Sequence, residues 1–264
     1  MKLLMAAFVL FSLQVFGQET TPKNNFNINS AIRLPGEDYQ KAFQRYRNGI
    51  KASRSLLPAT SAVGEAVSYA KLDYKSASTV LSPQDAVAVF QKGRDTRFLT
   101  TPAQPLFPRR SSWLYPDDGC WARAALFSEN METWNYPRAF KIFAFGNLDV
   151  KTANSSQGHV SWWYHVVPGA VVNGHVTVFD PAIEPKNPVT LEEWLLKMVP
   201  DLASVRVSIC SPKTYTPSSD CQAPLDTEEN RAVADQTNYL YAEWQRLLSL
   251  KRDPTKELGD SPPW

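Results

Sequence analysis

The chain has 264 residues, of which 43% are hydrophobic and 20% charged, and its net charge is +2. This length and composition suffice for one packed domain with an accessory segment. The near-neutral charge, with isolated basic pairs such as Arg109-Arg110, argues against a nucleic-acid-binding protein. No Cys-x-x-Cys, His-Glu-x-x-His or glycine-rich phosphate loop occurs, so we expect no metal and no other cofactor.

Residues 1–17 have the features of a secretory signal peptide. Met1-Lys2 is a short basic start, residues 3–16 are mostly apolar, and Gly17 is a small residue at the predicted cleavage site. The apolar run is too short to span a membrane, and no cysteine follows it to carry a lipid anchor. We therefore expect a secreted or periplasmic protein without a membrane anchor, and a monomer.

Residues 18–108 are predicted to form an N-terminal accessory or pro-like segment. Apolar residues at helical spacing favour a helix over residues 38–52. Ser82 is a good N-cap before Pro83, which favours a second helix that runs to residue 91. Three prolines in residues 100–108 indicate a linker, so we place a domain boundary there.

Residues 109–222 are predicted to form the core domain, followed by a C-terminal helix and tail in residues 223–264. The core elements are a helix over 119–131, strands over 140–145, 160–167, 175–179 and 205–209, and a short helix that a capping box opens at 190–193. The C-terminal helix is predicted over 228–251, with Val233, Leu240, Trp244 and Leu247 on one face and a stop at Pro254. A helix followed by mostly antiparallel strands is an α+β pattern.

The three cysteines are Cys120, Cys210 and Cys221. In an oxidising compartment cysteines pair, and Cys210 and Cys221 flank a short loop rich in proline and serine, so they are the predicted disulfide. Cys120 is left over. An unpaired cysteine in an exported protein is either a buried inert thiol or a reactive one, and the count alone does not separate the two.

The surroundings of Cys120 favour a reactive thiol. Residues 115–124 read Tyr-Pro-Asp-Asp-Gly-Cys-Trp-Ala-Arg-Ala, so a turn leads directly into the predicted helix and Cys120 comes at its N-terminus. There, free backbone N–H groups and the positive end of the helix dipole favour a thiolate. The same N–H groups could stabilise a developing oxyanion.

A thiol nucleophile needs a base, and the chain offers three histidines. His159 follows Gly158 and is predicted in a loop, whereas His175 follows the turn signal Asn173-Gly174 and is predicted at the surface. His165 lies in an aromatic strand. It is either a satisfied core residue or the base that faces an active-site cleft.

Asp180 is the candidate residue to orient His165, because it ends the next predicted strand. The turn between the two strands can centre between positions 171 and 173.5. Every such centre leaves Asp180 within about three residues of the position that faces His165. The alternative is that Asp180-Pro181 only ends a strand, and the spacing favours neither interpretation.

Four segments resemble one family of cysteine enzymes. Residues 115–124 resemble the nucleophile motif of bacterial protein glutaminases, Tyr-Pro-x-Asp-Gly-Cys-aromatic-Ala-Arg-Ala. Residues 145–148 resemble the Gly-Asn-Leu segment of that family, residues 162–166 its Trp-x-Tyr-His-Val strand, and Asp180-Pro181 its Asp-Pro. The resemblance covers residues 112 to 182, and the order of Cys, His and Asp is that of papain-like and transglutaminase-like enzymes.

The resemblance implies a papain-like or transglutaminase-like core, with the nucleophile at a helix N-terminus that packs on an antiparallel sheet. It implies a catalytic triad of Cys120, His165 and Asp180, and hydrolysis of the side-chain amide of protein-bound glutamine through a cysteine thioester. Trp162 is a candidate residue of the substrate cleft, with core packing as the alternative. The family is typically made as a proenzyme, so residues 18–108 would cover the site; the alternative is a subdomain that stays attached.

Three other functions share this set of residues. A cysteine peptidase would cleave backbone amides, and a transglutaminase would pass the acyl group to an amine instead of water. A binding module would keep the fold without turnover. Only the resemblance favours a deamidase acting on proteins or peptides with exposed glutamine.

Overall fold

The computed structural model describes residues 30–52, 57, 59–75, 77–222, 229–259 and 262. The predicted signal peptide and its cleavage site lie outside these residues. The helices are α1 (Tyr39–Ala52), α2 (Ala62–Glu65), α3 (Pro83–Asp95), α4 (Cys120–Thr133), α5 (Leu191–Leu196), α6 (Glu229–Ser249) and α7 (Pro254–Leu258), with short 3-10 turns η1 (Tyr69–Lys71) and η2 (Leu202–Ser204). The strands are β1 (Val67–Ser68), β2 (Val80–Leu81), β3 (Leu99–Thr101), β4 (Gln104–Arg109), β5 (Phe140–Lys151), β6 (His159–Val172), β7 (His175–Val178), β8 (Val189–Thr190) and β9 (Arg206–Cys210).

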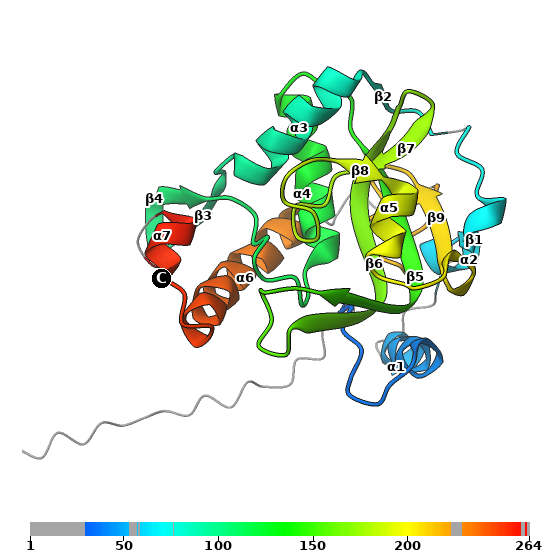
Figure 1. Ribbon diagram of the computed structural model, residues 1–264, viewed down its shortest axis with the longest axis horizontal. Helices are drawn as coiled ribbons and strands as arrows, with labels where there is room; N and C mark the ends of the chain where they lie inside the picture. The colour runs from blue at the N-terminus through cyan, green and yellow to red at the C-terminus, as the bar shows by residue number, and fades with distance from the viewer. Residues whose placement is uncertain are drawn as a thin grey trace, which may run out of the picture.

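One seven-stranded sheet forms the centre of the molecule (Figure 1). Its strand order is β1-β9-β5-β6-β7-β8, all of these pairs are antiparallel, and β2 adds a short parallel pair to β6. The two long central strands, β5 and β6, are rich in aromatic and β-branched residues, which favour a buried pleated surface. Strand β6 carries His165, and Ala144 of β5 pairs with it.

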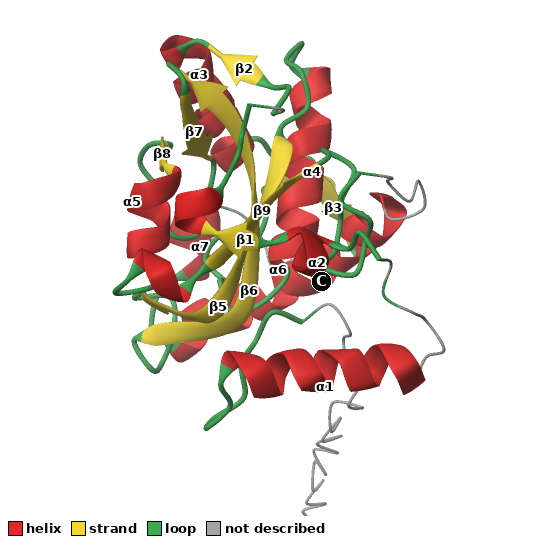
Figure 2. Ribbon diagram, turned by 90° about the vertical axis from the view of Figure 1, so that its right-hand side faces the viewer, coloured by secondary structure: helices red, strands yellow, loops and turns green. Residues whose placement is uncertain are grey.

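Helix α4 packs against β6, and α3 and α6 flank it (Figures 1 and 2). Ten of its residues are buried, so it is a core helix with little amphipathic character. Helix α1 lies across the end of β5 and β6, where Tyr46 and Phe43 pack on the Trp163 ring at 4.8 and 6.1 Å between ring centroids. The predicted α+β class, with a helix that begins at Cys120 and packs on an antiparallel sheet, is confirmed.

The β6–β7 hairpin has the two-residue turn Asn173-Gly174, whose φ angles of 49° and 78° lie in the left-handed region. Such turns match the twist of the strands and favour Asn-Gly. Val172 pairs with His175, so the hairpin centres at 173.5, the last of the positions that the sequence allowed. Ladder pairing ends where Gly169 pairs with Val178, and the chain then continues to Asp180.

The segment 100–108, predicted as a linker, is instead a hairpin: that prediction is wrong. Strands β3 and β4 pair, with Thr101 opposite Gln104 and Leu99 opposite Arg109. In a two-stranded sheet each strand has one edge without ladder bonds, and proline is tolerated there. The prolines therefore did not exclude strands. The domain boundary at residue 109 stays a prediction.

Three smaller expectations also need correction. Helix α6 ends at Ser249, and Pro254 begins the separate helix α7 after the N-cap Asp253. His159 begins β6 and is not in a loop. Val233 is exposed, whereas the other three residues predicted on its helix face are buried. The remaining predicted helices and strands are confirmed, although α3 and β5 run four and six residues further than expected.

The predicted disulfide is confirmed: Cys210 and Cys221 are bonded, and Cys120 is free and buried. The predicted capping box is present, because Thr190 caps the backbone of Glu193 and the Glu193 carboxylate accepts the Thr190 N–H. Across the described part of the chain, none of the helices has the length and apolar character needed to cross a membrane.

Candidate active site

Cys120 is the first residue of α4, as predicted. The preceding Gly119 has a φ of +78°, a conformation that favours glycine, and its N–H donates to Asp118 Oδ1 at 2.9 Å. No side chain caps this helix, so the N–H groups of its first turn keep free hydrogen-bonding capacity. The local sequence thus delivers a thiol and free backbone donors to the same place.

The Cys120 sulfur lies at β6, within hydrogen-bonding reach of the backbone N–H of Val166. Burial raises the pKa of the Cys120 thiol to about 12, against the lowering effects of Arg123 and of the Val166 N–H. The thiol is only 2% exposed and is neutral at pH 7 in this arrangement. It therefore needs a nearby proton acceptor before it can attack a substrate.

The two ring nitrogens of His165 have different environments. Nε2 hydrogen-bonds Asp180 Oδ2 at 2.9 Å, with both side chains buried. Nδ1 is buried and has no hydrogen-bond partner. Because Asp180 accepts a proton from Nε2, the lone pair of the neutral ring is on Nδ1. His165 immediately precedes Val166, the residue whose N–H contacts the Cys120 sulfur.

Asp180 stays ionised although it is fully buried. Burial by itself raises the pKa of its carboxyl, but the attraction and hydrogen bond of His165 and a hydrogen bond from Trp194 bring the pKa below its usual value. Trp194 Nε1 donates to Oδ2 at 2.9 Å, and the Ala182 N–H donates to Oδ1 at 3.2 Å. A buried carboxylate with these donors can orient an imidazole and stabilise its protonated form.

Two indole rings hold the His165 ring. Trp162 stacks on it at 4.6 Å between centroids with an interplanar angle of 10°, and Trp194 lies at 5.6 Å and 28°. Trp162 also donates from Nε1 to the Asp117 carbonyl at 2.9 Å. This bond links β6 to residues 110–119, the loop directly before Cys120, which we call the nucleophile loop. Trp162 is buried in this arrangement, and its role in a substrate cleft stays a prediction.

Two supporting residues were not assigned from the sequence. Arg123 is buried one helical turn after Cys120 and donates to the carbonyls of Asp118 at 2.7 Å and Tyr115 at 3.1 Å. The spacing of three residues could have placed it on the same helix face as Cys120. Trp194 had no comparable signal, because it reaches Asp180 from another element.

The structure brings Cys120, His165 and Asp180 to one end of α4, whereas the other two histidines lie elsewhere. His159 is exposed and pairs with Asp149 at 2.7 Å, and His175 is exposed at the hairpin turn. Within the described ranges, no three His, Cys, Asp or Glu side chains gather as a metal site requires. The chemistry that the site can support is a thiol nucleophile with a histidine base.

Comparison with known proteins agrees with the motifs. Residues 86–198 match a family model described as glutaminase. A crystal structure of protein-glutaminase is 20% identical, with 62% of this chain and 89% of that chain covered and a TM-score of 0.48. The NMR structure of protein-glutaminase from Chryseobacterium proteolyticum is 22% identical, with 62% and 90% covered and a TM-score of 0.47.

A crystal structure of pro-protein-glutaminase is 17% identical, with 75% of this chain and 68% of that chain covered and a TM-score of 0.43. Among curated proteins, no sequence matches the chain significantly. The family match contains all three residues of the candidate triad and extends beyond the four motifs on both sides. Residues 86–198 therefore match the glutaminase family that the motifs predict.

Proposed function

We propose that this protein hydrolyses the side-chain amide of protein-bound glutamine to glutamate and ammonia, with Cys120 as nucleophile, His165 as base and acid, and Asp180 as the residue that orients His165. The observation that supports the proposal most strongly is the hydrogen bonding of the two ring nitrogens of His165. One ring nitrogen is held by a buried carboxylate, and the other is buried, unpaired and next in the chain to the Val166 N–H that contacts the thiol.

The reaction would proceed in two steps. His165 Nδ1 takes the thiol proton as the Cys120 sulfur attacks the carboxamide carbon, and free N–H groups of the first turn of α4 stabilise the oxyanion. The C–N bond breaks, His165 returns the proton to the departing ammonia, and a thioester remains. His165 then activates a water molecule, which hydrolyses the thioester to glutamate and restores the thiol.

The site is closed in this structure, because each residue of the triad is no more than 2% exposed. Residues 30–33 lie along β6 beside it. The Ala31 N–H donates to Asp118 Oδ1, the Trp163 N–H donates to the Ala31 carbonyl at 2.9 Å, and the Arg33 N–H donates to the Ser161 carbonyl at 3.0 Å. Ile32 and Arg33 also line a pocket of about 510 Å³ that reaches Asp117.

We propose that the part of the N-terminal segment that covers the site is residues 30–52. Residues 30–33 occupy the backbone edge at Trp162 and Trp163, where an extended substrate peptide could pair. Helix α3 belongs to the same predicted segment, but it packs on α4 in a hydrophobic cluster that includes Phe90 of α3 and Phe127 of α4. We therefore expect α3 to stay with the domain. Displacement of residues 30–52 would give a protein substrate access to Cys120.

The test is ammonia release from a glutamine-rich protein, with wild type beside Cys120→Ala. We expect the substitution to lower the rate by at least about 1,000-fold, because the other triad residues act only with the nucleophile. His175→Ala, at the exposed β6–β7 turn outside the site, is the matched control and should keep the wild-type rate. Ammonia release that survives Cys120→Ala would refute the assigned mechanism.

The same assay separates the alternative functions. New amino termini in the substrate would indicate a peptidase, and incorporation of an added primary amine in preference to water would indicate a transglutaminase. Absence of all three signals, with and without removal of residues 30–52, would favour a binding module. Ammonia without new termini supports the deamidase.

A further inference from the structure

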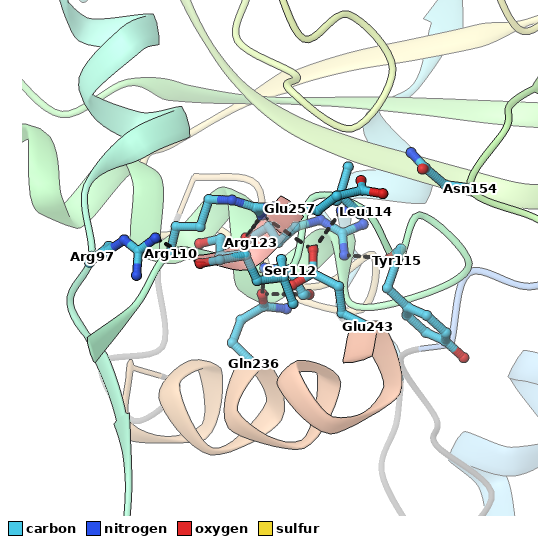
Figure 3. Close-up of polar contacts among 12 residues, drawn as sticks. Arg97, Arg110, Ser112, Leu114, Tyr115, Arg123, Asn154, Gln236, Glu243 and Glu257 are labelled. Carbon is cyan, nitrogen blue, oxygen red and sulfur yellow. Dashed lines mark hydrogen bonds and ion pairs between the residues drawn. The ribbon is translucent and has the colours of Figure 1, made fainter. Parts of the chain in front are cut away.

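The ten-residue loop that precedes Cys120 has no regular secondary structure, so its backbone groups need partners elsewhere. Residues 110–119 connect β4 to α4, and many of their partners come from one helix, α6, which is far away in the sequence. Figure 3 shows Gln236 and Glu243 pointing from α6 toward Ser112 and Leu114 of this loop.

Gln236 ties the two ends of the loop together. It is completely buried, and its Oε1 accepts the Ser112 N–H at 3.2 Å and the Ser112 hydroxyl at 3.0 Å. Its Nε2 donates to the Gly119 carbonyl at 3.3 Å. One carboxamide therefore contacts both the start of the loop and the residue directly before the candidate nucleophile.

The next residues on the same face of α6 hold the middle of the loop. Glu243 Oε1 accepts the Leu114 N–H at 2.7 Å and Arg110 Nη1 at 3.2 Å. Arg246 donates to both carboxylate oxygens of Asp117 at 2.8 and 2.9 Å. Gln236, Glu243 and Arg246 are seven and three residues apart, which is the spacing of one helix face.

The approach of α6 to the nucleophile depends on Gly119. A Cβ atom at Gly119 would lie 2.7 Å from the Tyr239 ring and 2.9 Å from Gln236 Nε2, closer than packed atoms allow. Tyr239 also stacks on the loop residue Tyr115 at 5.5 Å between centroids. The contact between α6 and the start of α4 is thus direct and tightly packed.

We propose that α6 is a positioning element of the active site and that Gln236 is its central positioning residue, setting where α4 begins and hence where the Cys120 sulfur lies relative to His165. This inference rests on the proposed function. It goes beyond the family match, because α6 lies outside residues 86–198. The opposite role for the same helix would be a cover whose removal activates the enzyme.

Gln236→Met tests the inference, because methionine has nearly the same length and lacks the hydrogen bonds. We expect kcat for ammonia release to fall by about 10- to 100-fold with little change in KM, since a displaced nucleophile binds substrate but reacts slowly. Gln245→Met, the same change on a face of α6 away from the loop, should keep wild-type kcat. Unchanged kcat or an increase in Gln236→Met would overturn the proposal.

Gln236→Glu makes the loss of the hydrogen bond to the Gly119 carbonyl depend on pH. A protonated carboxyl can accept from Ser112 and donate to the Gly119 carbonyl, whereas the ionised form cannot donate. The ratio of its kcat to that of wild type should therefore rise as the pH falls. Asn238→Asp adds a carboxyl on the exposed face of α6, and its ratio should stay constant with pH. A constant ratio for Gln236→Glu would contradict the inference.

Alkylation of Cys120 by iodoacetamide separates a failure of this inference from a failure of the proposed function. Cys120 is the only cysteine of the three outside the disulfide, so the label reports on it alone. If α6 positions the thiol, Gln236→Met shifts the midpoint of the alkylation pH profile, because the displaced thiol leaves the burial, the Arg123 charge and the Val166 N–H that together set its pKa. If α6 is a cover, alkylation becomes faster with an unchanged midpoint. If wild type releases no ammonia, the proposed function is rejected. The alkylation profile then still tests whether α6 positions the Cys120 thiol.

Discussion

At the scale of single residues, the site depends on what surrounds each titratable group. Cys120 is buried and neutral, and His165, which directly precedes the Val166 whose N–H contacts the Cys120 sulfur, has a buried Nδ1 without a hydrogen-bond partner. Asp180 is buried and ionised because His165 and Trp194 donate to the same carboxylate oxygen. The surroundings of each group, and not its residue type alone, therefore determine its protonation state.

The first prediction concerns Trp194→Phe, which keeps an aromatic ring against His165 and removes one donor from Asp180. The Trp194 hydrogen bond is one of the contacts that lower the pKa of Asp180, so its loss should raise that pKa. Because the ionised carboxylate is needed, the acidic limb of the kcat profile should move to higher pH. We expect kcat at neutral pH to fall about tenfold, the effect of one lost hydrogen bond to a charged group.

The measurement is a pH–rate profile of ammonia release for wild type and variant. Trp134→Phe is a suitable control, because Trp134 packs on Phe127 away from the triad. A lower kcat with an unmoved acidic limb would mean that Trp194 acts through packing alone.

At the scale of elements, the site is assembled where four parts of the chain meet. Helix α4 brings the thiol, β6 brings the histidine, and the segment after β7 brings the carboxylate. The β6–β7 turn matters here, because its two-residue Asn-Gly geometry sets the register that carries Asp180 past the end of the ladder to His165. Residues 30–33 then close the remaining backbone edge of β6.

The second prediction tests that closure. A specific protease site is inserted between Ala52 and Ala59, so that the chain folds intact and is cut afterwards. If residues 30–52 hold the site closed and the open form is populated at about 0.1–10%, cutting and release should raise ammonia production by about 10- to 1,000-fold. The uncut protein is the control, and an equal rate before and after cutting would mean that the segment is an integral part of the domain.

At the scale of the whole molecule, α6, residues 110–119 and the N-terminal segment meet around two acids, the buried Asp118 and the partly buried Asp235. Asp118 accepts hydrogen bonds from Gly119 and Ala31 and, together with burial, raises the pKa of Asp235 on α6 to about 7. Burial is the larger cause, and Arg123 and Arg231 act in the opposite direction. One oxygen of Asp235 is buried without a hydrogen-bond partner.

The third prediction follows from the sign of this shift. The folded state binds the Asp235 proton more tightly than the unfolded state, so its contribution to stability is full below the ordinary pKa of 3.8 and is lost progressively as the pH rises from there to about 7. Asp235→Asn keeps a neutral side chain at every pH. The free energy of unfolding of the variant minus that of wild type should therefore be more positive at pH 8 than at pH 5.

Urea unfolding at the two pH values measures both free energies. An equal difference between variant and wild type at pH 5 and pH 8 would show that Asp235 does not titrate in this range. An exposed Asp235 would give that result, since the raised pKa requires α6 to stay packed on the nucleophile loop.

Much of this structure could be predicted from the sequence, because the determining features are local. Helix α3 has a Ser-Pro start, α5 a capping box and β6–β7 an Asn-Gly turn, and each acts on the backbone within a few residues. The order of residues 115–124 likewise put Cys120 at a helix start. The hairpin of residues 99–109 was missed, because its prolines suit a free strand edge as well as a linker.

What the sequence alone determined is the set of reactive groups, their helix and strand positions, and the one cysteine left without a disulfide partner. Only the tertiary structure decided which ring nitrogen of His165 is free, that Trp194 supports Asp180, and that Gln236 holds the nucleophile loop across 117 residues of sequence. The physical reason is range: backbone preferences act over a few residues. A buried side chain finds its partners only when distant elements pack together.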